Sequence, residues 1–533
     1  MLIKTYGAAV QGIDAIVVTI EVVADRGVSY SLVGMADTAV RESHQRVVSA
    51  IMQSGFSWPR RRIVVNLSPA DVRKEGAAYD LPIAIGILTA SEQISCVHAL
   101  DSYMIMGELS LDGSVLPIKG VLPMAIKARE LGFKGMIVPQ ANVSEGAVVN
   151  NLDVYGVSSL TEVIEFFTGK RQLEPTIVDT RREFAESASV FDCDFSEVKG
   201  QDGVKRAFEV ACAGGHNILL VGPPGSGKSM MAKRLPTILP PLSLSEALET
   251  TKIHSVAGRL KSGSRLMTSR PYRSPHHTIS PVALVGGGSN PAPGEISLAH
   301  NGVLFMDEFP EFSRQVLEVM RQPLEDRHIT VARAKYTIDY PAGFMLVASM
   351  NPCPCGYYTH PTKECTCPPG AVQKYLNRIS GPLLDRIDLQ VEIMPVTFDN
   401  LVTTAPGESS KEIRERVVRA RLIQAHRYAA ERHIHCNAQM NNRLLGIHAK
   451  LDREGVEVLR ETMTRLDMSA RAYDRILKVA RTIADLDYAA REDFDPTDRT
   501  SLTSAANAPI LSDHLYEALA YRNLDRSSWG KRY

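Results

Sequence analysis

The sequence lacks long uncharged apolar runs and has no sign of a leader segment. No apolar run approaches the roughly 20 residues that span a bilayer, so no membrane partner is expected. The amino-terminal stretch MLIKTYGAAVQGIDAIVV is interrupted by Asp14 and shows neither a basic region nor a small-residue cleavage site, unlike a signal peptide. We therefore expect a cytoplasmic protein whose cysteines are reduced thiols.

Net charge and low-complexity segments are also absent. Lys+Arg and Asp+Glu both number 60, so any nucleic-acid binding must come from local basic surfaces and not from the overall field. With 44% hydrophobic and 23% charged residues, the composition is that of a globular protein and excludes a disordered or fibrous one. A chain of 533 residues is too long for one ordinary core, so several domains are expected.

Hydrophobic patterns divide the chain into four parts. Residues 1–170 alternate short β-rich runs with helical patterns, which predicts an α/β domain. Residues 171–195 are polar, mixed in charge and without an apolar period, as is typical of a linker. Residues 196–395 alternate helices with continuous apolar runs, which predicts a parallel sheet covered on both faces. Residues 396–533 are mainly helical in pattern.

A phosphate-binding loop follows the apolar run ILLV and opens a helical run. Glycine allows backbone N–H groups to approach phosphates, and a helix N-terminus favours their negative charge. Lys228 can reach the β and γ phosphates, and Ser229 can bind Mg²⁺, so the loop predicts ATP and Mg²⁺ as cofactors. The loop consists of Gly222, Pro223, Pro224, Gly225, Ser226, Gly227, Lys228 and Ser229.

Further candidates for phosphate chemistry lie downstream. The apolar run GVLFM ends in Asp307, which suits Mg²⁺, and Glu308, which could polarise the attacking water; alone, such a pair is often an exposed turn. The run FMLVASM ends in Asn351, which could position that water or merely cap a strand. Arg386, in SGPLLDRIDL, could pair with a neighbouring aspartate on the surface or stabilise the transition state of a neighbouring subunit.

These elements, in this order, resemble an AAA+ ATPase. Three stretches are more specific: SPHHTISPVALVGGGSNPAPGEISLAHNGVLFMDE, NPCPCGY and SARAYDRILKVARTIADL. They resemble the magnesium-chelatase-like AAA+ subgroup and, within it, the ComM (YifB) family over essentially the whole chain. The resemblance implies a P-loop AAA+ core with a parallel sheet and a helical lid. It also implies that Asn351 is the sensor-one residue, Arg386 the arginine finger and Arg471 the sensor-two arginine, although Arg465 and Arg475 lie nearby.

The first domain resembles the protease domain of Lon. The Lon nucleophile falls on Ala78 in KEGAAYD, and the Lon lysine falls on Leu122, with Lys119 and Lys127 nearby. A Ser–Lys dyad needs a hydroxyl beside an amine that acts as base, and neither residue is present at these positions. We therefore expect an α/β Lon-protease-like domain without proteolytic activity that serves in binding or assembly.

A hairpin is predicted in RHITVARAKYTIDYPAGFML, with Arg333 and Lys335 near its tip. The resemblance implies that this hairpin faces the channel of a ring, where the two side chains could contact a DNA backbone; they could equally be exposed charges on an edge hairpin. The basic run at residues 60–62 has the same two interpretations, with a solvated strand edge favoured.

Three function classes follow. The family resemblance implies a hexameric motor or helicase that acts on single-stranded and branched DNA and promotes branch migration during recombination in natural transformation. The alternative is a magnesium-chelatase-type motor subunit or remodelling factor that does not act on DNA. An ATP-dependent protease would need the dyad that the first domain lacks. The first class is favoured.

Half of the eight cysteines lie within residues 351–370, in NPCPCGYYTHPTKECTCPPG. Four thiolates suit tetrahedral Zn²⁺, but C-x-C is tighter than the usual C-x₂₋₄-C spacing, so a proline-stiffened loop with free thiols is an equal alternative. His360 is a possible substitute ligand, whereas His276 and His277 are expected to be ordinary hydrogen-bonding histidines. The candidate zinc ligands are Cys353, Cys355, Cys365 and Cys367.

Overall fold

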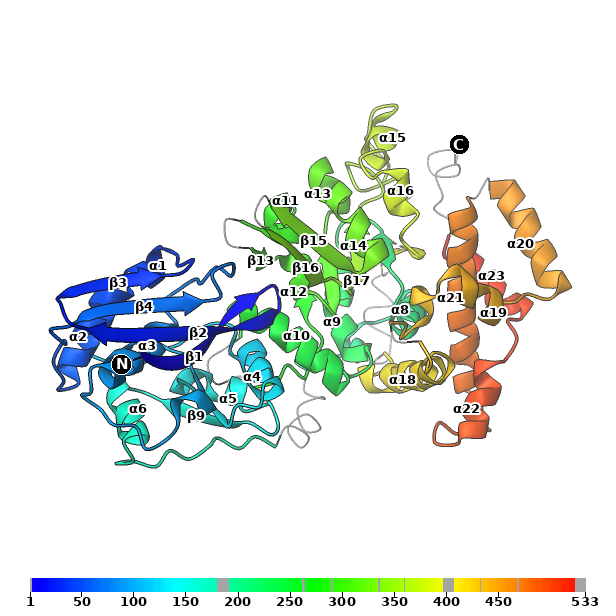
Figure 1. The fold of residues 1–533 in the computed structure, drawn as a ribbon. Helices are drawn as coiled ribbons and strands as arrows, with labels where there is room; N and C mark the ends of the chain where they lie inside the picture. The colour runs from blue at the N-terminus through cyan, green and yellow to red at the C-terminus, as the bar shows by residue number, and fades with distance from the viewer. Residues whose placement is uncertain are drawn as a thin grey trace.

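A computed structural model shows three parts in a row: an amino-terminal α/β domain, a central nucleotide-binding domain and a carboxyl-terminal helical region (Figure 1). None of the described helices is long and apolar enough to cross a membrane. The residues that the structure describes are 2–179, 191–260, 263, 265–288, 291–333, 336–358, 360–395, 407–431, 433–466 and 469–522.

The amino-terminal domain is built on a seven-stranded mixed sheet with the order β3-β4-β2-β1-β5-β8-β9. Its strands are β1 (Leu2–Gln11), β2 (Asp14–Asp25), β3 (Ser29–Val33), β4 (Arg62–Ser68), β5 (Tyr103–Ile105), β8 (Gly135–Pro139) and β9 (Asp153–Val157), with a separate ribbon of β6 (Glu108–Leu109) and β7 (Val115–Leu116). Its helices are α1 (Thr38–Arg41), α2 (Ser43–Gln53), α3 (Asp80–Ala90), α4 (Val121–Glu130), α5 (Val143–Gly146) and α6 (Leu160–Phe167).

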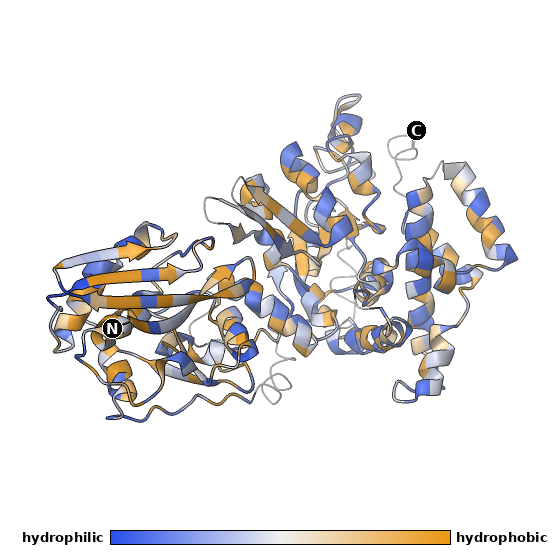
Figure 2. Cartoon of the chain, in the orientation of Figure 1, coloured by the Kyte–Doolittle hydropathy of each residue, from blue (hydrophilic) through white to orange (hydrophobic). Residues whose placement is uncertain are grey.

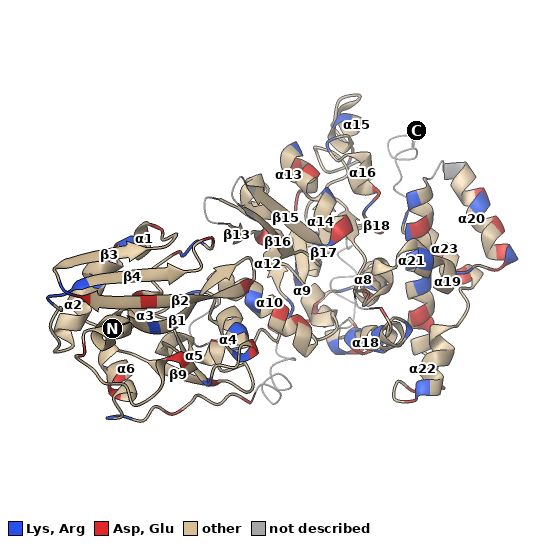
Figure 3. Cartoon of the chain, viewed as in Figure 1, with Lys and Arg blue, Asp and Glu red and all other residues tan. Residues whose placement is uncertain are grey.

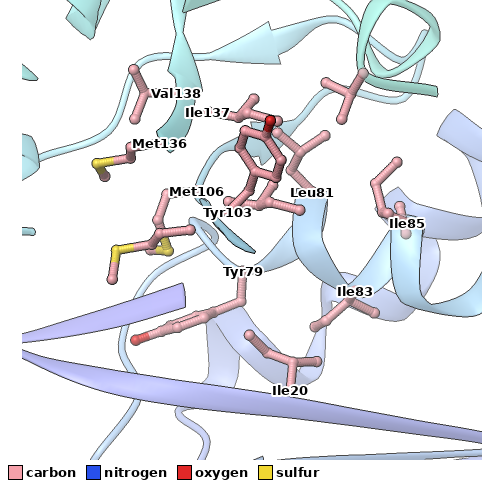
Figure 4. Close-up of a cluster of buried hydrophobic side chains, with 14 of the residues drawn as sticks. Ile20, Tyr79, Leu81, Ile83, Ile85, Tyr103, Met106, Met136, Ile137 and Val138 are labelled. Atoms are coloured by element: carbon pink, nitrogen blue, oxygen red, sulfur yellow. The ribbon is translucent and has the colours of Figure 1, made fainter. Parts of the chain in front are cut away.

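The core of this domain forms around α3. All eleven residues of α3 are buried, because the helix packs against β1 and β2 on one side and the rest of the domain encloses it. Figure 4 shows apolar side chains of β2, α3 and β8 converging on this core. Tyr79 is buried at the start of α3, and its hydroxyl donates to the Ala8 carbonyl at 3.1 Å, so its polar atom is satisfied.

The central domain contains a five-stranded sheet with the order β11-β14-β17-β10-β18, in which every neighbouring pair is parallel. The residues of β10 alternate between two cores: Ile218 and Leu220 join one cluster, and Leu219 and Val221 join the other. A strand buried on both faces has to be apolar throughout, which confirms the predicted α/β fold class. The strands are β10 (Ile218–Val221), β11 (Tyr272–Arg273), β14 (Val303–Met306), β17 (Met345–Met350) and β18 (Leu389–Glu392).

Helices and two small ribbons surround this sheet. The β15–β16 hairpin exists as predicted, and Ile329 and Val331 bury its apolar face against the domain. The ribbons pair β12 (Gly286–Gly287) with β13 (Ala292–Pro293) and β15 (His328–Arg333) with β16 (Tyr336–Pro341). The helices are α8 (Asp202–Gly214), α9 (Lys228–Ile238), α10 (Leu244–Val256), α11 (Pro281–Val285), α12 (Glu295–Leu298), α13 (Arg314–Val319), α14 (Arg321–Asp326), α15 (Ala371–Leu376) and α16 (Gly381–Leu384).

The carboxyl-terminal region is helical, as predicted. In α18 the residues Ile413, Val417 and Ala420 face inward, and the exposed sides of these helices carry both signs of charge (Figures 2 and 3). Its helices are α18 (Ser410–Arg427), α19 (Asn442–His448), α20 (Arg453–Leu466), α21 (Ala470–Ala489), α22 (Arg499–Ala506) and α23 (Ser512–Ala520).

Candidate nucleotide-binding site

The predicted phosphate loop connects β10 to α9, and α9 begins at Lys228. Gly225 and Gly227 have φ angles of +79° and +87°, in the left-handed region that glycine adopts at little cost. A side chain at Gly222 would collide with the carbonyl oxygen of Ile393, so glycine is required for the close approach of the residue that follows β18. The loop therefore presents its backbone N–H groups at a helix N-terminus, an arrangement that binds phosphates.

Lys228 lies at the centre of the loop with 9% of its surface exposed. Its ammonium donates to the carbonyls of Gly222 at 2.6 Å and Pro223 at 2.9 Å, and to Asn351 Oδ1 at 3.3 Å. Burial lowers the pKa of Lys228, and the nearby Asp307 carboxylate opposes this shift. The structure thus brings together the lysine and the asparagine that the sequence predicted for one site.

Asp307 and Ser229 meet at the end of β14. The Ser229 hydroxyl donates to Asp307 Oδ2 at 2.7 Å, and the Ser349 hydroxyl donates to Asp307 Oδ1. Mg²⁺ prefers oxygen ligands, and this pair of a hydroxyl and a carboxylate fits it. When bound, the ion would neutralise charge on the phosphates, with Ser229 and Asp307 holding it.

Ser349 was not predicted from the sequence. The register of β14 and β17 pairs Met306 with Ala348, so the next residues, Asp307 and Ser349, lie opposite each other. The sequence places Ser349 two residues before Asn351, which is the signal that could have found it.

Ser226, within the phosphate loop, has an unsatisfied hydroxyl. The hydroxyl is buried and has no hydrogen-bond partner among the described residues. A buried hydroxyl left unsatisfied is costly, so a ligand that supplies an acceptor would stabilise this loop. A phosphate oxygen is such an acceptor.

Glu308 follows Asp307 in a left-handed conformation with φ of +52°. Left-handed backbone is uncommon for a residue with a side chain and recurs at functional sites. The side chain of Glu308 is 58% exposed and directly follows Asp307, the predicted Mg²⁺ ligand. It is therefore accessible to a water molecule and remains the predicted base.

Arg386 lies at the opposite end of the sheet. Its backbone carbonyl accepts from Asn217, which precedes β10, whereas the phosphate loop follows β10. A four-residue strand separates these ends by about 13 Å. The Arg386 guanidinium donates to the Pro382 carbonyl at 2.7 Å and pairs with Glu325. The predicted alternative, a surface pair with a neighbouring aspartate, is therefore not what the structure shows. Arg386 is therefore remote from the phosphate loop of its own chain.

Two arginines of α21 have different environments. Arg475 pairs with Asp388 at 2.9 Å, and Asp388 is buried. Burial raises the pKa of Asp388, but Arg475 and His216 outweigh this and hold the pKa well below its usual range. Arg475 thus fixes the helical region to the central domain. Arg471, one turn earlier, is exposed and has no hydrogen bond or ion pair to a described residue.

The four candidate zinc ligands converge. Their sulfur atoms all lie within 4.8 Å of one another, with Sγ–Sγ distances of 3.2 Å for Cys353–Cys355, 3.5 Å for Cys355–Cys365 and 3.7 Å for Cys353–Cys365. Four sulfurs at 2.3 Å from a tetrahedral Zn²⁺ would be about 3.8 Å apart, so the group fits this ion. None of the described cysteines forms a disulfide. His360 Nδ1 accepts from backbone N–H groups of its own loop.

The cysteine segment also contacts the phosphate loop. Gly356 has a φ angle of +84°, and a Cβ at this position would lie 2.5 Å from Pro224 Cδ. Glycine is therefore required where the two loops touch. The segment that carries the cysteine group is thus in direct contact with the predicted phosphate loop.

The basic candidates for DNA contact are only partly described. Lys335 and the side chain of Arg333 lie outside the described residues, so their contacts stay predictions. In the basic run before β4, Arg60 and Arg62 are exposed and Arg61 lies 3.6 Å from Glu92.

The Lon-type dyad positions carry no catalytic pair. The Ala78 carbonyl accepts from the Gly107 amide at 2.8 Å. Leu122 is fully buried, and its amide donates to Glu145 at 2.9 Å. The Lys119 side chain packs so closely against Gly258 of the central domain that a Cβ on Gly258 would collide with it. At the position that the Lon resemblance assigns to the catalytic lysine, the structure thus has a buried apolar residue, and the nearby Lys119 makes a contact with the central domain.

The phosphate loop, the Asp307 corner and the all-parallel sheet define a P-loop ATPase of the AAA+ class. The chain matches three magnesium chelatase families: subunit ChlI of Mg-chelatase over residues 20–142, magnesium chelatase subunit ChlI over residues 194–401, and its C-terminal family over residues 407–495.

Full-length relatives refine this class. The chain is 41% identical over 524 residues to the competence protein ComM of Haemophilus influenzae, covering 98% of this chain and 97% of that protein. It is 42% identical over 523 residues to YifB of Escherichia coli, covering 97% and 96%. The chain belongs to the ComM/YifB family of magnesium-chelatase-like AAA+ ATPases.

Two weaker similarities are in line with a Lon-like domain. The Lon protease of Mycoplasma mobile is 26% identical over 150 residues, which are 26% of this chain and 18% of that protein. The DNA repair protein RadA of Halalkalibacterium halodurans is 25% identical over 135 residues, which are 25% of this chain and 29% of that protein.

Proposed function

We propose that the protein is an ATP-driven DNA motor that moves branched recombination intermediates during natural transformation. The observation that carries the proposal is the similarity over nearly the whole chain to a protein named for competence, the state in which cells take up DNA. The similarity to this relative covers both the ATPase domain and the Lon-like domain. We propose that a motor uses the two domains together.

The β15–β16 hairpin supports DNA as the substrate. It follows α14 and leads within a few residues into β17, the strand that is followed by Asn351. A load on the hairpin would therefore act on the strand that carries the predicted sensor residue. With Arg333 and Lys335 at its tip, we propose that the hairpin contacts the phosphate backbone of single-stranded and branched DNA.

We further propose that the working form is a hexamer with ATP sites between subunits. Arg386 is about one strand length away from its own phosphate loop. An arginine finger that cannot reach its own nucleotide can serve the nucleotide of a neighbour. Arg471 is exposed on the same side, near Glu325, the partner of Arg386, and we assign it to the same intersubunit site as the sensor-two residue.

We propose that the four-cysteine group binds one structural Zn²⁺. Because this segment begins two residues after Asn351 and touches Pro224, the ion would fix the loop that borders both the sensor strand and the phosphate loop. Zinc held by four thiolates stabilises a fold and leaves no open position for catalysis.

The test is DNA-dependent ATP turnover and junction movement by the purified oligomer. The proposal predicts that single-stranded or branched DNA stimulates ATPase activity and that a Holliday junction is moved with ATP. A chelatase-type motor that does not act on DNA would hydrolyse ATP at a rate indifferent to DNA and would leave the junction in place.

A further inference from the structure

Asn217 binds the backbone of the predicted arginine finger. It directly precedes β10, is 8% exposed, and donates from Nδ2 to the Arg386 carbonyl oxygen at 3.1 Å. Arg386 lies in the turn that follows α16, and a buried carbonyl outside a helix needs a donor from elsewhere in the fold. The main chain of the finger is therefore attached to the sheet through one side chain.

The side-chain amide of Asn217 fits in only one orientation. Its Oδ1 atom accepts from the Leu346 amide in β17 at 2.9 Å, while Nδ2 faces the Arg386 carbonyl. A backbone N–H only donates and a carbonyl oxygen only accepts, so a flipped amide would lose both bonds. Because both bonds are buried, the side chain is a fixed bridge between β17 and the finger.

The main chain of Asn217 holds the residues that follow the finger. Its N–H donates to Asp388 Oδ2 at 3.0 Å, and its carbonyl accepts from the amides of Asp388 and Leu389, each at 3.0 Å. Asp388 is 1% exposed and pairs with Arg475 of α21 at 2.9 Å. The segment from Arg386 to Leu389 is therefore attached at both ends to one residue at the start of the central strand β10.

This backbone attachment differs from the contacts of the Arg386 side chain. The guanidinium contacts Pro382 and Glu325 of its own subunit, and these contacts compete with a nucleotide in a neighbouring subunit. The bond from Asn217 goes to the main chain, so it can persist while the guanidinium reaches the nucleotide. Misplacing a catalytic group by about 1 Å can cost on the order of 10²-fold in rate, so this anchor bears on turnover.

We propose that Asn217 is a positioning residue for ATP hydrolysis in the neighbouring subunit. It fixes the main chain of Arg386 so that the guanidinium reaches the nucleotide across the interface. This role rests on the proposed action of Arg386 in trans, and it does not depend on DNA as the substrate. Chain order alone suggests the opposite, an effect in cis, because β10 leads from Asn217 to the phosphate loop of the same subunit.

The test uses N217A in mixtures of full-length subunits. Alone, N217A should lose roughly tenfold to 10²-fold in ATP turnover, while its affinity for a fluorescent ATP analogue stays within about twofold. In an equal mixture with K228A, the intact phosphate loop of N217A can meet the intact finger of K228A, so about a quarter of the turnover should return. In a mixture with R386A neither subunit supplies a well-placed finger, and turnover should stay low.

N217D is the second variant. Its carboxylate has the shape of the amide and keeps an oxygen that accepts from the Leu346 amide, but it has no donor for the Arg386 carbonyl. The same pattern in the two mixtures is expected. N217D decides the question if the loss of both bonds in N217A prevents folding.

Three results would overturn this role: turnover of the variants within about twofold of the unchanged protein, recovery with R386A, or no recovery with K228A. The last two would show that Asn217 acts on its own phosphate loop or on folding. R386A tests the proposed function separately. If R386A alone keeps its turnover, the action in trans and this role both fail. If K228A restores R386A but not N217A, only this role fails.

Discussion

Ser255 donates a hydrogen bond to Glu145, and this bond joins the central domain to the amino-terminal domain. Glu145 is buried and also accepts from the amide of Leu122, the position of the Lon lysine. Helix α10 lies against α4 at this joint, and Lys252 pairs with Asp14 at 2.5 Å beside it (Figure 1). The position that the Lon resemblance assigns to the catalytic lysine therefore lies at the contact between the amino-terminal and central domains.

Removing the Ser255 hydroxyl should loosen this joint. S255A takes one donor from a buried carboxylate, which costs about 1 to 3 kcal/mol. Hydrogen exchange should therefore accelerate at the start of α4 and the end of α10. S245A, an exposed serine on the same helix, is the matched control. Equal exchange in S255A and S245A would show that the bond does not couple the domains.

Arg386 should be needed for turnover and should act on a neighbouring subunit. R386A is expected to lose about 10³-fold or more in ATP turnover while ATP binding persists. K228A should also be inactive, because its own phosphate loop is defective. In an equal mixture, an intact loop of an R386A subunit can meet the Arg386 of a K228A subunit, so about a quarter of the turnover should return. A mixture as inactive as its components would contradict action in trans.

Metal analysis decides the role of the cysteine group. The purified protein should contain about one Zn²⁺ per chain, since four thiolates complete a tetrahedral site. C365S should lose most of it, and C96S, which changes a cysteine outside the group, should retain it. If the unchanged protein contains no zinc, the zinc site is wrong and the alternative interpretation, a proline-stiffened loop with free thiols, holds.

Changing the hairpin tip should weaken DNA binding more than ATP hydrolysis. R333A and K335A each remove one phosphate contact, so the slope of log affinity against log salt should fall by about one per residue. ATP turnover without DNA should stay near its original value. R60A tests the other basic surface: a larger effect on DNA affinity there than at the hairpin would move the contact to the amino-terminal domain.

The sequence predicted what is continuous along the chain and missed what depends on register between separated strands. The phosphate loop, its strand and its helix are adjacent in sequence, and apolar runs such as ILLV revealed a sheet buried on both faces. Ser349 was not assigned to the site, because it meets Asp307 through the offset of a parallel strand pair. The partner of Arg386 was also missed, since Glu325 lies on a different helix 61 residues away.

The most direct test of the central claim is ATP-dependent movement of a Holliday junction by the purified oligomer. The unchanged protein should convert the junction to duplex products when ATP and Mg²⁺ are present, and K228A, which lacks the ammonium at the centre of the phosphate loop, should bind the junction without moving it. An unchanged junction with active protein, together with an ATPase rate that neither single-stranded nor double-stranded DNA alters, would contradict the account.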